Sequence, residues 1–416
     1  MDMRQLKALE IAARLRITWE DGAWSVPSAS GNGKYQVVLK PEGNTCTCPD
    51  HERTRQDCKH ILACLFVVER DYGGKPLPIE TDTLPVKKTY QQDWPKYDEA
   101  QTTEKHRLQK LLFEVCSGIP EPPPPERKGR PRVPLADAVF AACYKNYVGF
   151  SARRFACDLQ DAVAKGYLSR SIHFSSVNAS LEKAALTPIL HSLITQTSLP
   201  LQAVETVFAP DSSGFTTSRY TRWYDVKYGR LRAEADWVKV HLIAGTKTHI
   251  ITAAIIAGKD AHDAPHLAEL VKKTADNFTI KEVPADKGYL SAENVEVVAE
   301  HGGEAFIAPK SNTTGAVGGL FEKMFHYYQF RRDDFLKHYH QRSNVETTYA
   351  MVKAKFGGYV RSKTDTAMMN EVLCKIVCHN LCVLIQSQIE LGIESVFWED
   401  KPTEHRAVIL PMAQPV

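Results

Sequence analysis

The chain has 416 residues, 43% of them hydrophobic, and a formal net charge of +3 at pH 7. This length allows about two to four domains with a large core. The small net charge excludes a protein that binds nucleic acid through an overall cationic surface, so any basic surface must be local. No uninterrupted apolar run is long enough to span a bilayer, and residues 1–16 read as an amphipathic helix, not as a signal peptide. We therefore expect a cytoplasmic protein without membrane partners, whose ten cysteines are thiols or metal ligands.

Two close pairs of potential metal ligands lie near the start of the chain. Cys46, Cys48, Cys58 and His60 have the spacing C-x-C-x9-C-x-H, and four such ligands suit a tetrahedral Zn²⁺ ion. Two strands are predicted ahead of them, and the segment from Cys58 onward reads as a helix. This ββα arrangement resembles the SWIM zinc finger over about residues 20–72. The resemblance implies a structural zinc, because four protein ligands leave no open coordination position. The alternative is a set of buried thiols beside a surface histidine.

A linker and a helical region are expected next. Residues 75–133 include most of the Pro-rich, basic segment GIPEPPPPERKGRPRVP, a composition typical of a semi-rigid linker. Apolar residues at helical spacing then predict several helices over residues 134–200. Small polar and basic residues at the expected helix starts suit a helix-turn-helix that contacts DNA. A plain helical bundle with capped ends explains them equally well.

From residue 201 the pattern changes to strands alternating with helices. Three apolar runs predict three strands, and two shorter strands follow, separated by helices. This order predicts a mixed sheet flanked by helices, in which functional residues gather at strand ends. Asp211 follows the first run, and Asp286 follows the fourth. Each also suits a turn, and Asp225 and Asp236 are alternatives to Asp211.

One expected helix face carries an unusual set of polar groups. In KHYHQRSNVETTYAMVKAKFGG, residues 337–358, Tyr339, Arg342, Glu346 and Lys353 fall within roughly 60° of one another around a helix. The apolar residues of this segment lie mostly elsewhere, where they can pack. A phenol, a guanidinium, a carboxylate and an ammonium in line indicate a site for a phosphate-bearing substrate. The alternative is a solvated face with ion pairs between successive turns.

These segments carry a resemblance to a known family. The pattern Y-x2-R-x3-E-x6-K resembles the signature of the YREK-type DDE transposases of bacterial insertion sequences, and all four positions match. VETVFAPDSSGF is similar to the strand that carries their first acid, and KEVPADKGYLSAENVEVV is similar to their second-acid strand and following helix. The resemblance covers about residues 130–390. It implies an α/β multidomain protein with an RNase H-like mixed β-sheet core, flanked by helices and preceded by a helical DNA-binding region.

The resemblance also implies a role for each site residue. The three acids would bind two Mg²⁺ or Mn²⁺ ions, which prefer carboxylate oxygens, and would catalyse phosphodiester cleavage. Three residues of the polar face would hold phosphates of the DNA end. The acids are Asp211, Asp286 and Glu346, and the phosphate-binding residues are Tyr339, Arg342 and Lys353.

The implied protein is a DNA transposase of the bacterial cytoplasm, associated with the nucleoid. It would cleave at the terminal inverted repeats of its own element and join the freed ends to target DNA. Because two ends must be joined, a homodimer or larger assembly on DNA is expected. The interval between Asp286 and Glu346 is only about sixty residues. That leaves little room for the large β domain that helps some relatives form DNA hairpins, so hairpin chemistry is not expected.

The expected domains follow from these assignments. They are a SWIM-type zinc finger over residues 1–74, a linker over 75–133, a helical DNA-binding region over 134–200, a catalytic domain over 201–391 and a C-terminal tail over 392–416. Two other functions are compatible with the sequence. One is a catalytically silent DNA-binding or regulatory protein derived from a transposase. The other is a different RNase H-like nuclease, such as a junction resolvase.

Overall fold

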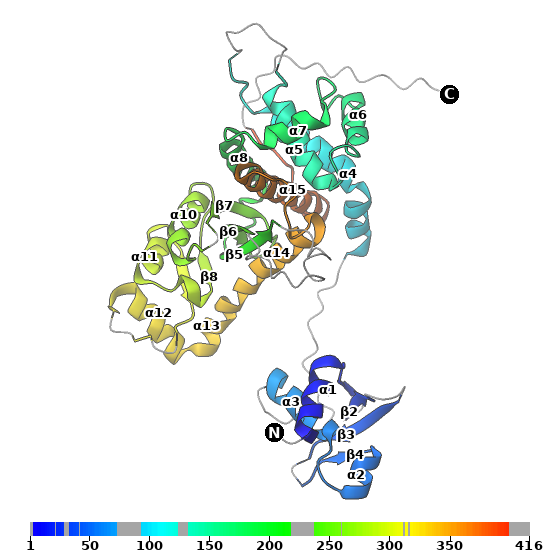
Figure 1. Cartoon of the computed structure of the whole chain (residues 1–416). Coiled ribbons are helices and arrows are strands. Elements are labelled where there is room, and N and C mark those ends of the chain that lie inside the picture. The colour runs from blue at the N-terminus through cyan, green and yellow to red at the C-terminus, as the bar shows by residue number, and fades with distance from the viewer. Residues whose placement is uncertain are drawn as a thin grey trace. The chain divides into compact units, whose positions relative to one another are not determined.

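The computed structural model of the chain is shown in Figure 1. It describes residues 3–20, 22–28, 33–40, 42–72, 93–123, 132–217, 237–258, 260–310, 313–314 and 317–398. The chain divides into two compact units, unit 1 (Met1–Gln91) and unit 2 (Gln92–Val416). Asp225, Asp236, much of the Pro-rich segment and the end of the expected tail lie outside the described residues.

Unit 1 is a small antiparallel sheet packed against helices. The strand order is β1-β2-β3-β4, and α1 and α3 lie against each other, contributing Ala8, Ile11, Ile61 and Cys64 to a buried core. The sequence does not predict β1 and β4, because strands of three and two residues are too short to show alternation. The elements are α1 (Met3–Arg14), β1 (Thr18–Glu20), β2 (Ala23–Pro27), β3 (Lys34–Val38), β4 (Thr45–Cys46), α2 (Pro49–Thr54) and α3 (Lys59–Tyr72).

The helical layer of unit 2 is built around one long helix, α15. This helix packs against α4, α5, α7 and α8, and Figure 1 shows it between these helices and the strands β5, β6 and β7. The helices expected over residues 134–200 therefore bury their apolar faces against a segment from much later in the chain. The elements are α4 (Trp94–Ser117), α5 (Leu135–Val148), α6 (Ala156–Ala164), α7 (Phe174–Leu181), α8 (Leu186–Ser198), η1 (Leu199–Leu201) and α15 (Asp365–Leu391).

The linker predicted over residues 75–133 contains α4. The side chain of Asp93 caps this helix by accepting a hydrogen bond from the Lys96 backbone N–H. Its second half buries Leu108 and Leu112 against the helical layer. The prediction is wrong over this range because the first half of the helix is polar and exposed, so it shows no apolar period.

The first residues of the expected tail pack on unit 2. Phe397 is 6% exposed, and the indole N–H of Trp398 donates to the carbonyl oxygen of Val115, at 3.2 Å, near the end of α4. A side chain at Gly118 would overlap the Trp398 ring. Only glycine therefore fits where α4 ends.

α15 is long and apolar enough, by length and composition, to cross a membrane, but 83% of its most apolar window is buried within the protein. It is the core helix of unit 2. It also holds a buried ion pair, Glu371 with Lys375, at 3.7 Å between Oε1 and Nζ. Glu371 accepts hydrogen bonds from the backbone N–H groups of Arg361 and Ser362, and Lys375 donates to the Gly357 carbonyl. The pair thereby fixes the segment that follows α14.

The described strands of unit 2 form two sheets, which an isolated bridge links. β5, β6 and β7 are antiparallel and neighbours in that order, while β8 and β9 are parallel. Val207 bridges in parallel to Glu282 and so joins β5 to β8. The elements are β5 (Phe208–Thr216), β6 (Trp237–Gly245), β7 (Ile251–Ala257), α10 (Ala264–Ala275), β8 (Glu282–Ala285), η2 (Lys287–Tyr289), α11 (Ala292–Glu300), β9 (Glu304–Ile307), α12 (Gly319–Phe330), α13 (Arg332–Tyr339), η4 (His340–Arg342) and α14 (Ser343–Phe356).

Candidate functional site

The cysteine and histidine cluster lies in unit 1, at the junction of β4, α2 and α3. Cys46 ends β4, and Cys48 caps α2 by accepting a hydrogen bond from the His51 backbone N–H. Cys58 precedes α3, and His60 is the second residue of that helix. Two helix starts and a strand end therefore bring the four side chains together.

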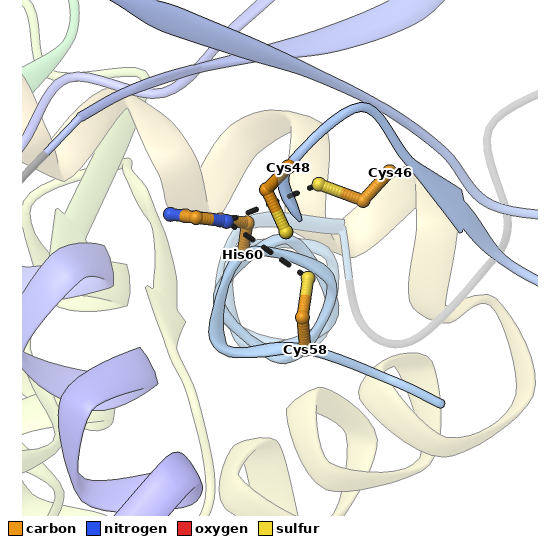
Figure 2. Close-up of side chains that lie close together, drawn as sticks. All are labelled: Cys46, Cys48, Cys58 and His60. Atoms are coloured by element: carbon orange, nitrogen blue, oxygen red, sulfur yellow. Dashed lines mark hydrogen bonds between the residues drawn. The ribbon is translucent and has the colours of Figure 1, made fainter. Parts of the chain in front are cut away.

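The geometry of this cluster fits a tetrahedral metal ion. Figure 2 shows the four side chains turned toward one another. Their ligand atoms lie within 4.8 Å of one another, and all four residues are buried. The His60 Nδ1 atom is 3.9 Å from the Sγ atoms of Cys46 and Cys58. Tetrahedral Zn²⁺ with three thiolates and an imidazole needs separations of about 3.6–3.8 Å. The cluster therefore needs only a small contraction to hold zinc.

The thiols of the cluster are coupled by hydrogen bonds. The neighbouring Cys46 thiol lowers the pKa of Cys58; burial opposes this effect, and His60 adds to it. The pKa of Cys46 is raised by its hydrogen bond with Cys58 and by burial. A thiolate beside further thiols and an imidazole is the donor set that zinc prefers.

Asp211 and Asp286, in unit 2, lie on neighbouring strands. Asp211 is in β5 and Asp286 directly follows β8. Val207 and Glu282 pair in parallel, and each acid comes four residues after its member of that pair. Since parallel strands rise equally and lie about 4.8 Å apart, the register puts the two acids side by side.

The pKa of Asp211 depends on its burial and on the other acids of the site. Its pKa is raised to about 6, first by burial and then by the negative charges of Glu346, Asp263 and Asp286, against a backbone hydrogen bond from Ser212. A bound cation would reduce the repulsion between these carboxylates.

Arg342 lies between the other two acids. Its Nη1 atom is 2.8 Å from Glu346 Oε1 and 3.9 Å from Asp286 Oδ1. The side chains of Asp286 and Glu346 are 52% and 57% exposed. The guanidinium also lies 5.3 Å from the centre of the Tyr339 ring, and Tyr339 is only 7% exposed. The buried Tyr339 ring thus packs against the Arg342 guanidinium.

The polar face falls on three helical segments, not on one continuous α-helix. Tyr339 ends α13, Arg342 ends the 3-10 turn η4, and Glu346 and Lys353 belong to α14. A 3-10 turn winds more tightly than an α-helix, yet Arg342 still lies beside both Tyr339 and Glu346. Lys353 reaches β5 and donates from Nζ to Ser213 Oγ at 2.6 Å.

Sequence reasoning missed a fourth acid, Asp263, at the N-cap position of α10. Its Oδ1 accepts a hydrogen bond from Ser212 Oγ at 2.8 Å and lies 2.9 Å from Lys239 Nζ. A side chain at Gly288 would lie 3.8 Å from Asp263 Oδ2 and 3.9 Å from Asp286 Oδ2. An aspartate just ahead of a helix looks like an ordinary helix cap. No sequence signal distinguishes such a cap from an acid of the site.

Asp263 contacts a buried histidine, His241. The imidazole Nδ1 lies 3.6 Å from Asp263 Oδ1, and burial lowers the pKa of His241 to about 4. His241 is fully buried, and neither ring nitrogen has a hydrogen-bond partner among the described residues. It is therefore a neutral group behind the acids and adds no positive charge to them.

The acid set suits a divalent cation by its chemistry. Carboxylate oxygens are the ligands that Mg²⁺ and Mn²⁺ prefer. Burial raises the pKa of Asp211, and the negative charges of the other acids add to this effect. Among the described residues, only the zinc-type cluster gathers three or more ligand atoms as closely as 4.8 Å. The acids of unit 2 are therefore more widely spaced, and Arg342 supplies the positive charge between two of them.

Comparison with known proteins identifies both regions. Residues 202–381 match the family model of the transposase DDE domain, and residues 35–68 match that of the SWIM zinc finger. These two matches fit a DDE transposase with an N-terminal SWIM zinc finger. Both resemblances seen in the sequence are thereby confirmed. The acids of unit 2 lie within the range matched by the DDE domain, and the four zinc-type ligands lie within that of the SWIM finger.

The other comparisons add little. No curated protein matches the chain. A solved piggyBac transposase synaptic complex with hairpin DNA is similar, with 10% sequence identity over 74% of this chain and 77% of that chain, at a TM-score of 0.33.

Proposed function

We propose that the chain is a DNA transposase whose DDE domain cleaves DNA at the terminal inverted repeats of its element and joins the ends to target DNA. The observation that carries this proposal is the gathering of Asp211, Asp286 and Glu346. They come from β5, the end of β8 and α14, and they are linked by strand register, by charge and by Arg342. All three lie within the matched DDE domain.

The fold of the DDE domain is proposed to be RNase H-like. Its three antiparallel strands lie in the order β7-β6-β5, and the Val207–Glu282 bridge adds β8 and then β9 in parallel beside β5. α14 packs on β5 and β6. This fold requires two acids on or next to strands of the sheet. It requires a third acid on a late helix that crosses the sheet.

The acids are proposed to hold two divalent ions, Mg²⁺ or Mn²⁺. Bound ions of this kind activate a nucleophile and stabilise the leaving oxygen of a phosphodiester. Asp211 contributes from the sheet, where its position is fixed by the strand. Asp286 and Glu346 contribute from the exposed side, where DNA enters.

The cationic residues are proposed to hold the DNA backbone. Arg342 can form two hydrogen bonds to one phosphate, and Lys353 adds a point charge beside β5. Burial lowers the pKa of Lys353, so a phosphate nearby would stabilise its charged form. Tyr339 positions Arg342 through its ring. Since two DNA ends must be joined, we propose that at least two copies assemble on DNA.

The zinc-type ligands of unit 1 are proposed to hold a structural Zn²⁺. Four buried protein ligands leave no coordination position for water. The ion would therefore fold unit 1 and would take no part in the chemistry of unit 2.

The proposal is tested with a duplex that carries the terminal inverted repeat found in DNA beside the gene. We expect Mg²⁺-dependent nicking at the repeat end, and we expect Asp286→Asn to abolish nicking while DNA binding persists. Asp333→Asn, an exposed acid on α13, is the matched control and should nick normally. Nicking that survives in Asp286→Asn would contradict the assignment.

The same substrate separates the alternatives. A silent regulatory protein would bind the repeat but never nick it. A different nuclease would nick but fail to join the cut end to a second duplex in a strand-transfer assay. A transposase should do both.

A further inference from the structure

Asp263 makes contacts that an ordinary helix cap does not make. It stands at the N-cap position of α10, where an aspartate side chain usually accepts a hydrogen bond from the first turn of the helix. In the described helix no backbone N–H makes that bond. The Oδ1 atom instead accepts a hydrogen bond from Ser212 Oγ at 2.8 Å. The carboxylate is therefore directed at strand β5, and none of the roles proposed above uses it.

Asp263 reaches β5 from the face opposite to the Asp211 side chain. Successive side chains of a strand point to opposite faces of the sheet, so Ser212 points away from the face that Asp211 and Ser213 share. Lys353 of α14 donates to Ser213, which identifies the shared face as the one that α14 covers. The bond between Ser212 and Asp263 therefore lies on the other side of the sheet, next to α10.

Ser212 connects this bond to Asp211. Its backbone N–H donates a hydrogen bond to the Asp211 carboxylate, and its hydroxyl donates to Asp263. One residue is thus bound to Asp211 through its backbone and to Asp263 through its side chain. A shift of Ser212 would move the donor that orients the Asp211 carboxylate.

The edge of β5 next to the acids has few backbone partners. Val207 bridges to Glu282 at one end of the strand, and Thr216 bridges to Tyr359 at the other. Between these two bridges, none of the described strands pairs with this edge of β5. Asp211 lies in that interval. Contacts from side chains must therefore help to fix the backbone around Asp211.

A second contact of this kind comes from the α14 face. The Tyr349 hydroxyl lies 3.1 Å from the carbonyl oxygen of Asp211 and 2.7 Å from that of Val240. Tyr349 is only 5% exposed, so water has little access to this contact. The backbone at Asp211 thus has one support from each face of the sheet, Tyr349 on one side and Asp263, through Ser212, on the other.

Asp263 is itself held in place by an ion pair. Its Oδ1 atom lies 2.9 Å from Lys239 Nζ, and Lys239 also donates to the carbonyl oxygen of Ala261 at 2.6 Å. With Oδ1 bonded to a lysine and a serine, Asp263 is poorly suited to bind a cation through that atom. The alternative is that the ion pair only anchors the segment that precedes α10.

We propose that Asp263 is a positioning residue that orients Asp211 through Ser212. The inference rests on the proposed transposase function, in which Asp211 binds divalent ions. Hydrogen-bonded partners outside the set of metal ligands orient those ligands, and their loss usually weakens metal binding about 10- to 100-fold. Because Asp263 acts through a second residue, its effect should lie near the lower end of that range.

The test measures Mn²⁺ binding to the full-length, zinc-loaded protein by electron paramagnetic resonance. In Asp263→Ala and in Ser212→Ala we expect the Mn²⁺ affinity to fall about 10-fold. The double variant should lose no more than either single variant, because both changes break the same bond. Asp263→Asn should keep most of the affinity, because its amide oxygen still accepts a hydrogen bond from Ser212 Oγ.

Two further variants serve as controls. Glu293→Ala removes an exposed acid from the first turn of α11 and should bind Mn²⁺ like the parent. Lys239→Met removes the ion pair but not the bond to Ser212, so it should lower the thermal midpoint and keep the Mn²⁺ affinity. Parent affinity in Ser212→Ala would overturn the inference. Equal losses in Asp263→Asn and Asp263→Ala, or in Lys239→Met and Asp263→Ala, would overturn it as well.

Nicking of the terminal repeat by the unmodified protein is scored separately. If the parent nicks and its Mn²⁺ affinity does not depend on Ser212 and Asp263, only the inference fails. If the parent neither binds Mn²⁺ nor nicks, the proposed function fails together with the inference.

Discussion

The cluster of unit 1 and the acids of unit 2 both gather potential metal ligands, but they are built in opposite ways. The ligands of unit 1 come from residues 46–60, and each is at most 5% exposed. The acids of unit 2 come from residues 211–346, and two of them have side chains that are more than half exposed. A buried set with close ligands keeps its ion and shapes the fold, whereas an exposed, charged set can exchange ions and admit a substrate.

The two regions also differ in what holds their ligands. In unit 1, neighbouring strand and helix ends position the ligands, so the ion and the local fold depend on each other. In unit 2, the acids belong to a sheet and helices whose hydrophobic cores are formed by other residues. Removing an ion should therefore unfold the first region, while removing an acid should leave the second folded.

The largest expected effect is the loss of zinc from unit 1. In Cys58→Ser, or after a strong chelator, we expect unit 1 to unfold, because an apparent binding energy of about 10–16 kcal/mol can contribute to the folding of such a domain. Metal analysis should find about one zinc per chain in the parent and none in the variant. The thermal transition of unit 2 should not change.

The matched control for this experiment is Cys157→Ser, since Cys157 is exposed in unit 2. It should keep its zinc. If Cys58→Ser folds normally with unit 1 intact, zinc does not hold this unit together, and the contrast between the two regions disappears.

The next largest effect is expected from the buried ion pair of α15. Glu371 and Lys375 have side chains that are 2% and 3% exposed. Glu371→Gln leaves the lysine charge unpaired in the core, which costs about 3–5 kcal/mol. Denaturant unfolding should show this loss in unit 2 alone.

Glu394→Gln, an exposed acid after α15, should change the stability by less than about 0.5 kcal/mol. Equal stability of Glu371→Gln and Glu394→Gln would show that the buried pair does not fix the segment after α14. The experiment sharpens the comparison between the two units, because it changes the stability of unit 2 without changing its exposed acids.

A smaller, opposite effect is expected at Asp211. Its pKa is raised from 3.8 to about 6 in the folded protein. Between these values the folded state keeps a proton that the unfolded state loses, so stability falls as the pH rises from about 4 to 6. Asp211→Asn should then stabilise the metal-free protein at pH 7 by about 1–3 kcal/mol.

The parent and Asp211→Asn should be compared by denaturant unfolding at pH 7 and at pH 4, with a chelator present. At pH 4 the two proteins should be nearly equally stable, because both side chains are then mostly uncharged. Mg²⁺ should restore more stability to the parent than to Asp211→Asn. A difference of the same size at both pH values would mean that charge repulsion among the acids is not its cause.

The sequence predicted local groupings well and distant contacts poorly. The spacing of Cys46, Cys48, Cys58 and His60 predicts a cluster because a few turns of chain bring them together. The polar face of residues 337–358 was visible for the same reason. That Arg342 pairs with Asp286, from a distant strand, cannot be read from helical spacing, which shows only that Arg342 and Glu346 share a face.

The features that were missed also have physical causes. Asp263 looks like any helix cap, and only the fold brings it to Ser212 and to Asp286. α4 was read as part of a linker because its apolar face is complete only when α15 lies against it. The helix α15 has the length of a membrane span, but charged and polar residues interrupt its apolar run, and Glu371 and Lys375 among them pair inside the folded unit.

The central place of α15 has a consequence for how the protein is made. Helices α4, α5, α7 and α8 leave the ribosome long before the helix that covers their apolar faces. Unit 2 must therefore wait for nearly 400 residues of synthesis before its core can close. The core of unit 1 lies entirely before residue 72, so that unit can fold while unit 2 is still being translated.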